Sequence, residues 1–235
     1  MPLRTWRSPP PRTPFAPNWT VPLFIEELAD SVVNREIRSV VLSKEQQLRN
    51  DIEPIPISGI DDGLTSRWHG FNIFTWQEPC MRRFQKFVKN AYIRLLKETH
   101  APRTRCYIQG WANVVRSGER LSPHSHDQSP FSYLSGNYCV TSQDSATIYY
   151  PPYVYAGSLD PKTSIAIKNR PGMLTIFPSG IFHETSIHKG DQERITLAFD
   201  IFLEDVDPRG RSGHEGTHIL FDDPQEPVGG SPLRN

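Results

Sequence analysis

The sequence lacks a long apolar run, an excess of charge of one sign and a closely spaced pair of cysteines. No stretch of eighteen apolar residues occurs, so a membrane-spanning helix is not expected. The 26 basic and 26 acidic side chains give a formal net charge of zero, and charge therefore offers no attraction for nucleic acid or an anionic membrane. The cysteines, at positions 80, 106 and 139, are scattered, which predicts reduced thiols in a cytoplasmic protein.

Proline, by contrast, is abundant, with 22 residues. This argues against an all-helical protein and favours short strands joined by turns. Residues 1–18 are rich in proline and arginine without an apolar stretch, which predicts an extended arm and not a secretory signal. Residues 19–204 have the length of one domain. Residues 205–235, rich in acidic residues, proline and glycine, are expected to form a tail or lid with little packed structure.

Two amphipathic segments precede a region rich in strands. Apolar residues recur at helical spacing over residues 26–48 and about 81–98, and residues 21–25 form a short apolar run that fits an edge strand. After residue 99, segments rich in β-branched and aromatic residues predict strands at 106–115, 131–141, 147–150, 163–167, 173–177 and 194–203. The pattern predicts a mainly β (α+β) fold, a barrel or sandwich with the two helices packed outside.

The histidines suggest a metal site. If residues 122–127 are the end of a strand, alternation places His124 and His126 on one face and Asp127 on the other. His183 follows a turn, a buried strand and another turn, which would bring it to the mouth of a barrel. An isolated His-x-His is a weak signal, so the hypothesis depends on the ordered set.

Arg194 opens an otherwise apolar strand. A buried guanidinium needs an anion, and it grips a carboxylate with two hydrogen bonds. Thr196 shares its strand face and is placed to donate its hydroxyl group to the same carboxylate.

This order of residues resembles that of the 2-oxoglutarate and Fe(II)-dependent oxygenases, whose pattern is His-x-Asp/Glu, then His, then Arg. It is most similar to a bacterial and phage subgroup with a Pro-His-x-His motif. The resemblance covers residues 105–203 well and the N-terminal third loosely. It is carried by Trp111-Ala112-Asn113-Val114, Gly118, Pro123-His124-Ser125-His126, Leu134-Ser135-Gly136-Asn137-Tyr138, Pro171-Gly172-Met173-Leu174, Phe177-Pro178-Ser179, His183 and Arg194-Ile195-Thr196.

The resemblance implies a double-stranded β-helix, the cupin-like jelly roll, with the N-terminal helices packed outside. It also implies Fe(II), 2-oxoglutarate as cosubstrate and O2. His124, His126 and His183 would be the metal ligands and catalytic residues, and Arg194 with Thr196 would hold the distal carboxylate of 2-oxoglutarate. Ser135 and Tyr138 are further candidates for the cosubstrate site. Tyr107, Gln109, Trp111 and Asn113 alternate along one strand and are candidates for the substrate pocket, although the aromatic members also suit a core.

One departure from the pattern leaves the third metal ligand open. His126 stands where the family usually has Asp or Glu, so the usual 2-His-1-carboxylate face is altered. Either His126 binds the metal, or Asp127 turns in to replace it, or water completes a site built on His124 and His183.

Three functions fit this sequence. The leading hypothesis is an oxygenase that oxidises a C–H bond of a small-molecule or amino-acid-like substrate at the expense of 2-oxoglutarate. The second is a three-histidine, cupin-type dioxygenase that does not use 2-oxoglutarate. The third is a non-catalytic jelly-roll module that binds a metal or small ligand, because fold alone does not fix function. A homodimer is compatible with each of them.

Overall fold

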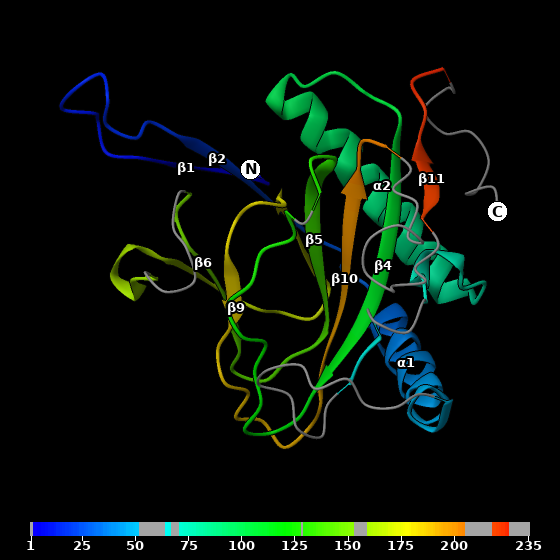
Figure 1. Ribbon diagram of the computed structural model, residues 1–235. Helices are drawn as coiled ribbons and strands as arrows, with labels where there is room; N and C mark the ends of the chain where they lie inside the picture. Colours follow the sequence, from blue (N-terminus) through cyan, green and yellow to red (C-terminus); the bar gives the residue numbers. More distant parts are fainter. Residues whose placement is uncertain are drawn as a thin grey trace.

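Figure 1 shows the computed structural model, which describes residues 2–51, 64–66, 71–127, 129–152, 159–204 and 218–225. The larger sheet has eight strands in the order β1-β2-β8-β5-β10-β4-β11, with β3 paired to β4 beside this path. Its strands are β1 (Leu3–Arg7), β2 (Thr20–Glu27), β3 (Leu64–Thr65), β4 (Cys106–Val115), β5 (Ser132–Thr141), β8 (Met173–Pro178), β10 (Arg194–Phe202) and β11 (Ile219–Asp222).

A smaller sheet has the order β7-β6-β9. It consists of β6 (Ala146–Tyr149), β7 (Ile165–Lys168) and β9 (His183–Thr185). Every pairing in both sheets is antiparallel. Two short 3-10 helices, η2 (Ile73–Thr75) and η4 (Pro161–Thr163), lie in the connections. The mainly β fold with two long helices is therefore confirmed. No helix in the described part of the chain combines the length and apolarity needed to cross a membrane.

The two helices, α1 (Ser31–Asp51) and α2 (Pro79–Thr99), cover one face of the larger sheet, and β6 and β9 lie on the other side of it (Figure 1). The two faces of strand β10 explain this arrangement. Its residues Ile195, Leu197 and Phe199 pack with both helices in the main hydrophobic core. Because side chains alternate along a strand, the even-numbered residues from Arg194 to Asp200 point away from the helices. The space between the two sheets thus receives the polar face of β10.

The start of α1 differs from the prediction. Residues 20–27 form β2, which pairs with both β1 and β8 and so is not an edge strand. The helix begins after Asp30, whose Oδ1 accepts hydrogen bonds of 3.1 Å from the backbone N–H groups of Val32 and Val33. This is the N-cap arrangement, which satisfies two donors that the first turn leaves unpaired. Helix α2 is confirmed, starting two residues earlier than expected, at Pro79.

Both ends of the chain contribute a strand to the larger sheet. Residues 3–7, within the predicted extended arm, form β1 and pair with β2. The prediction of little packed structure after residue 204 is wrong for residues 219–222, which form β11 on β4. The remaining parts of that segment, 205–217 and 226–235, lie outside the described residues.

Candidate active site

The structure brings the three predicted histidines together. One nitrogen from each of His124, His126 and His183 lies within 4.8 Å of the others. The backbone holds them there: His124 and His183 form an antiparallel bridge with N···O distances of 3.0 and 2.9 Å, and the N–H of His126 donates to the carbonyl of Ser179 at 2.9 Å. The His-x-His segment is thus joined to the edge of the smaller sheet that carries His183.

Hydrogen bonds fix which nitrogen each ring presents to the cluster. Nδ1 of His124 lies 2.6 Å from the carbonyl oxygen of Ser122, and Nδ1 of His183 lies 3.0 Å from that of Ile181. Nδ1 of His126 lies 2.6 Å from a carboxylate oxygen of Asp200. Carbonyl and carboxylate oxygens only accept, so each Nδ1 carries a proton, and Nε2 is the nitrogen of each ring that can bind a metal.

Three neutral imidazole nitrogens at this spacing fit a divalent transition metal. Nε2 of His126 is buried and has no hydrogen-bond partner in the part of the chain that the structure describes, and a bound cation would satisfy it. Asp127, the alternative ligand, is exposed and accepts a hydrogen bond of 2.6 Å from the hydroxyl of Ser125. The geometry therefore places His126, and not Asp127, beside the other two histidines.

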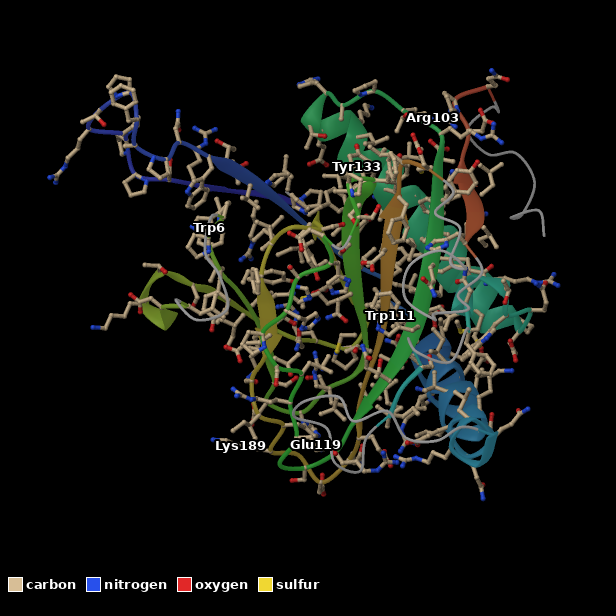
Figure 2. All side chains as sticks on the ribbon, viewed as in Figure 1. Trp6, Arg103, Trp111, Glu119, Tyr133 and Lys189 are labelled. Atoms are coloured by element: carbon tan, nitrogen blue, oxygen red, sulfur yellow. The ribbon has the colours of Figure 1, made fainter. Side chains whose placement is uncertain are left out.

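Aromatic side chains enclose the histidine cluster. The Trp111 ring stacks on that of His126 with centroids 5.6 Å apart, and the Phe177 ring packs edge-on against His183 at 4.8 Å. Figure 2 shows Trp111 on the side of β4 that faces β9. These contacts restrict the rotation of the imidazoles and exclude water from their flanks.

Arg194 is the most unusual side chain of the site. It is 1% exposed, and its Nε donates to the hydroxyl of Ser145 at 3.1 Å. Both terminal nitrogens are buried and have no hydrogen-bond partner among the described residues, and the same holds for the hydroxyl of Thr196 on the same face of β10. Burial lowers the pKa of the Arg194 guanidinium, but arginine stays charged in proteins. A buried, charged fork with two unused ends needs an anion.

Arg194 and the three histidines line one cavity of about 190 Å³ between the sheets. Of the predicted pocket residues on β4, Trp111 and Asn113 line it, as does Asn137 on β5. Tyr107 and Gln109 are not among its lining residues, because they lie nearer the opposite end of β4, where β11 pairs.

Two predicted cosubstrate residues have other contacts. The Tyr138 prediction is wrong: this residue packs in the main core against Phe84 of α2 and donates a hydrogen bond to Asn34 of α1. It lies on the helix-facing side of β5. Ser135 lies on the correct face, but its hydroxyl is 2.7 Å from a carboxylate oxygen of Asp200 and 3.0 Å from the Ser179 hydroxyl.

Of the remaining histidines, His188 is fully buried and its Nε2 donates to the carbonyl of Gln192 at 2.6 Å. His100 ends α2 in a left-handed conformation, and His218 packs on the Phe202 ring. His69 and His214 lie outside the described residues. Sequence reasoning missed Asp200, although it is an acidic residue in an apolar strand, at even spacing from Arg194 and Thr196.

Comparison with known proteins agrees with this geometry. Residues 109–200 match a family model described as "Putative 2OG-Fe(II) oxygenase". No curated protein matched the sequence. A Pseudomonas putida prolyl-4-hydroxylase is similar in structure at 9% identity, with a TM-score of 0.56 over 77% of this chain and 92% of that one.

Two further solved structures share the fold. The non-heme alpha ketoglutarate dependent carbocyclase SnoK from nogalamycin biosynthesis is 11% identical, with a TM-score of 0.57 over 91% of this chain and 92% of its own. The non-heme monooxygenase ThoJ is 11% identical, with a TM-score of 0.59 over 86% and 80%. These likenesses confirm the jelly-roll fold. The matched segment runs from β4 to β10 and includes the three histidines and Arg194, so this part of the chain is similar to the 2OG-Fe(II) oxygenases, a family of oxidoreductases that use Fe(II), 2-oxoglutarate and O2.

Proposed function

We propose that this chain binds Fe(II) through the Nε2 atoms of His124, His126 and His183 and binds 2-oxoglutarate through Arg194 and Thr196. It then oxidises a C–H bond of a small-molecule or amino-acid-like substrate. The observation that carries the proposal is the buried Arg194 fork, with two unpartnered nitrogens, in the same cavity as three histidine Nε2 atoms. One end of the cavity suits an anion and the other suits a metal.

Each residue has a distinct part in this mechanism. Arg194 binds and orients the distal carboxylate of 2-oxoglutarate with two parallel hydrogen bonds, and the Thr196 hydroxyl donates a third. The three histidines would hold the iron through their Nε2 atoms. Bound iron supplies the oxygen chemistry, with 2-oxoglutarate as the reductant. Trp111 and Phe177 keep water from the metal ligands.

The remaining residues that line the cavity limit the size and the polarity of the substrate. Asn113 and Asn137 line it beside Trp111, and amides next to an aromatic ring suit a compact substrate with hydrogen-bonding groups. A volume of about 190 Å³ admits a small molecule or a single side chain beside the cosubstrate. The free, buried cysteines agree with the predicted cytoplasmic location. That the protein forms a homodimer, and that it does not bind nucleic acid, are still predictions.

The test measures oxygen consumption and succinate formation by iron-loaded protein, with and without 2-oxoglutarate. We expect succinate only when both iron and 2-oxoglutarate are present, and none after treatment with EDTA. Calorimetric titration of 2-oxoglutarate into anaerobic Fe(II) protein provides a readout that needs no substrate. Oxygen consumption that ignores 2-oxoglutarate would instead indicate the cupin-type dioxygenase. Metal binding with neither turnover nor 2-oxoglutarate binding would indicate the non-catalytic module.

A further inference from the structure

Asp200 makes a buried contact with one of the three clustered histidines. It lies on β10, is 2% exposed, and its Oδ1 is 2.6 Å from Nδ1 of His126, which is 4% exposed. The contact joins residues 74 positions apart in the chain. Asp200 shares its strand face with Arg194 and Thr196, so one strand supplies both the cation of the carboxylate site and this anion behind the histidine cluster.

Neighbouring side chains hold Asp200 in place. The Ser135 hydroxyl is 2.7 Å from the same carboxylate oxygen, and Ser135 is in turn 3.0 Å from the Ser179 hydroxyl. Ser179 also accepts the backbone N–H of His126 at 2.9 Å. Three segments of the chain thus fix the aspartate relative to the imidazole, and a precise, buried carboxylate–histidine pair results.

A backbone carbonyl lies at Nδ1 of each of the other two histidines. Nδ1 of His124 and Nδ1 of His183 each donate to a neutral backbone carbonyl two residues earlier in the chain. A carbonyl is sufficient to fix the tautomer and orientation of a ring. A buried carboxylate is costly to place, so its position 2.6 Å from Nδ1 of His126 points to a role for its charge.

We propose that Asp200 is a positioning residue that supplies, through His126, the negative charge that a directly bound carboxylate supplies in a 2-His-1-carboxylate site. The inference rests on the proposed assignment of His126 as a metal ligand. Three imidazoles are neutral donors, and they leave the full charge of a divalent cation uncompensated. A carboxylate on Nδ1 makes Nε2 a stronger donor and holds it toward the metal. The carboxylate of Asp200 would thus act through the imidazole ring of His126 and not by direct contact with the metal.

The first experiment titrates metal-free protein with Co(II) and follows the absorbance of the bound ion. Asp200→Asn keeps the size of the side chain and removes its charge, and we expect it to weaken Co(II) binding by about 10–100-fold. The matched control is Ser135→Ala, which removes a hydrogen bond to the same oxygen and should have a much smaller effect. Circular dichroism confirms the fold, and Asp200→Ser replaces the asparagine variant if that variant does not fold.

A second experiment separates a charge effect from a structural one. His126→Asp restores a carboxylate ligand but places it beside Asp200, where two like charges repel. Replacing Asp200 by Asn should therefore strengthen Co(II) binding in the His126→Asp background, although it weakens binding in the wild-type background. Such a reversal of sign is a coupling between the two sites, and a purely structural role for Asp200 would not produce it.

Two results with the Asp200 variants would overturn the proposal: unchanged Co(II) affinity, or a loss of affinity of similar size in both backgrounds. Neither measurement uses 2-oxoglutarate or turnover, so a failure here is distinguishable from a failure of the proposed reaction. If His124→Ala and His183→Ala bind Co(II) as tightly as the wild type, the ligand assignment itself is wrong, and the role of Asp200 falls with it.

Discussion

Arg194 shows how a single side chain can indicate the kind of ligand that a cavity binds. Its guanidinium is held at Nε by Ser145, while both terminal nitrogens are buried without a partner. Leaving such a group unpaired costs several kcal/mol, which is tolerable in a functional site that an anion occupies. The Thr196 hydroxyl on the same strand face is also buried and has no hydrogen-bond partner among the described residues, and a carboxylate would satisfy both groups.

Replacing Arg194 by glutamine should therefore weaken 2-oxoglutarate binding and leave metal binding nearly unchanged. Loss of a buried, hydrogen-bonded charge pair costs about 2–5 kcal/mol, or tens to thousands of fold in affinity. Calorimetry on the metal-loaded protein measures both quantities. Arg116→Gln is the control, because Arg116 pairs with Glu45 at 2.9 and 3.0 Å and is not among the cavity-lining residues. Unchanged 2-oxoglutarate affinity in Arg194→Gln would assign Arg194 a structural role.

His126 and Asp127 give a second prediction at this scale. His126→Ala should lose most of its bound iron, and Asp127→Ala should retain about one ion per chain, because only His126 lies in the histidine cluster. Metal analysis after anaerobic loading and desalting measures the difference. The reverse result, with iron lost from the Asp127 variant alone, would show that the segment turns in solution and that the site has a carboxylate ligand.

Among the secondary-structure elements, β11 depends on one ionic cluster. The Asp222 side chain is fully buried and pairs with Lys89 of α2 and with Arg103 before β4, at 2.5 and 2.7 Å. Burial acts to raise the pKa of Asp222, but hydrogen bonds from Arg103 and Lys89 outweigh it and leave the pKa lowered. The cluster thus fixes β11 to α2 and to the start of β4.

Asp222→Asn should destabilise the fold by about 3 kcal/mol at neutral pH, since it leaves two cations near a neutral side chain. Because the folded-state pKa is lowered, the ionic contribution is fully present above the unfolded value of about 3.9 and is lost as pH falls through the lower folded value. Urea unfolding of both proteins at several pH values should therefore converge in strong acid. Asp223→Asn is the adjacent control, with its carboxylate 3.9 Å from a largely exposed Arg105, and should change stability little. A constant difference at all pH values would contradict the ionic origin.

At the scale of the whole molecule, the histidine cluster joins two parts of the jelly roll. His124 and His126 precede β5, and His183 belongs to β9, with the bridge between His124 and His183 connecting them. A metal bound to all three would tie these segments together in the folded state only. Metal binding should therefore stabilise the whole domain.

Loading with Fe(II) or Co(II) at a hundred times Kd should add about 2.7 kcal/mol, which corresponds to an increase in Tm of about 5–10 °C for a chain of this size. Differential scanning fluorimetry with and without EDTA measures this shift. In His183→Ala, the metal should raise the Tm much less. The shift is measured from the Tm of the same variant without metal. Equal shifts in the wild type and the variant would place the stabilising metal elsewhere.

The sequence by itself determined the local features. The helical spacing of apolar residues predicted α1 and α2, and alternation within one strand placed Arg194 beside Thr196 and His124 beside His126. The same rule bears on Tyr138: it lies three residues from Ser135, so a regular strand puts the two on opposite faces, as the structure shows.

Tertiary structure alone decided which segments meet. The pairing of β11 with β4 and of Asp200 with His126 joins residues separated by long stretches of chain. Side-chain periodicity is a property of one element and carries no register between distant strands. The register between strands follows from the packing of the two sheets and the helices together. That packing places Asp200, and not a residue next to His126 in sequence, in contact with the His126 ring.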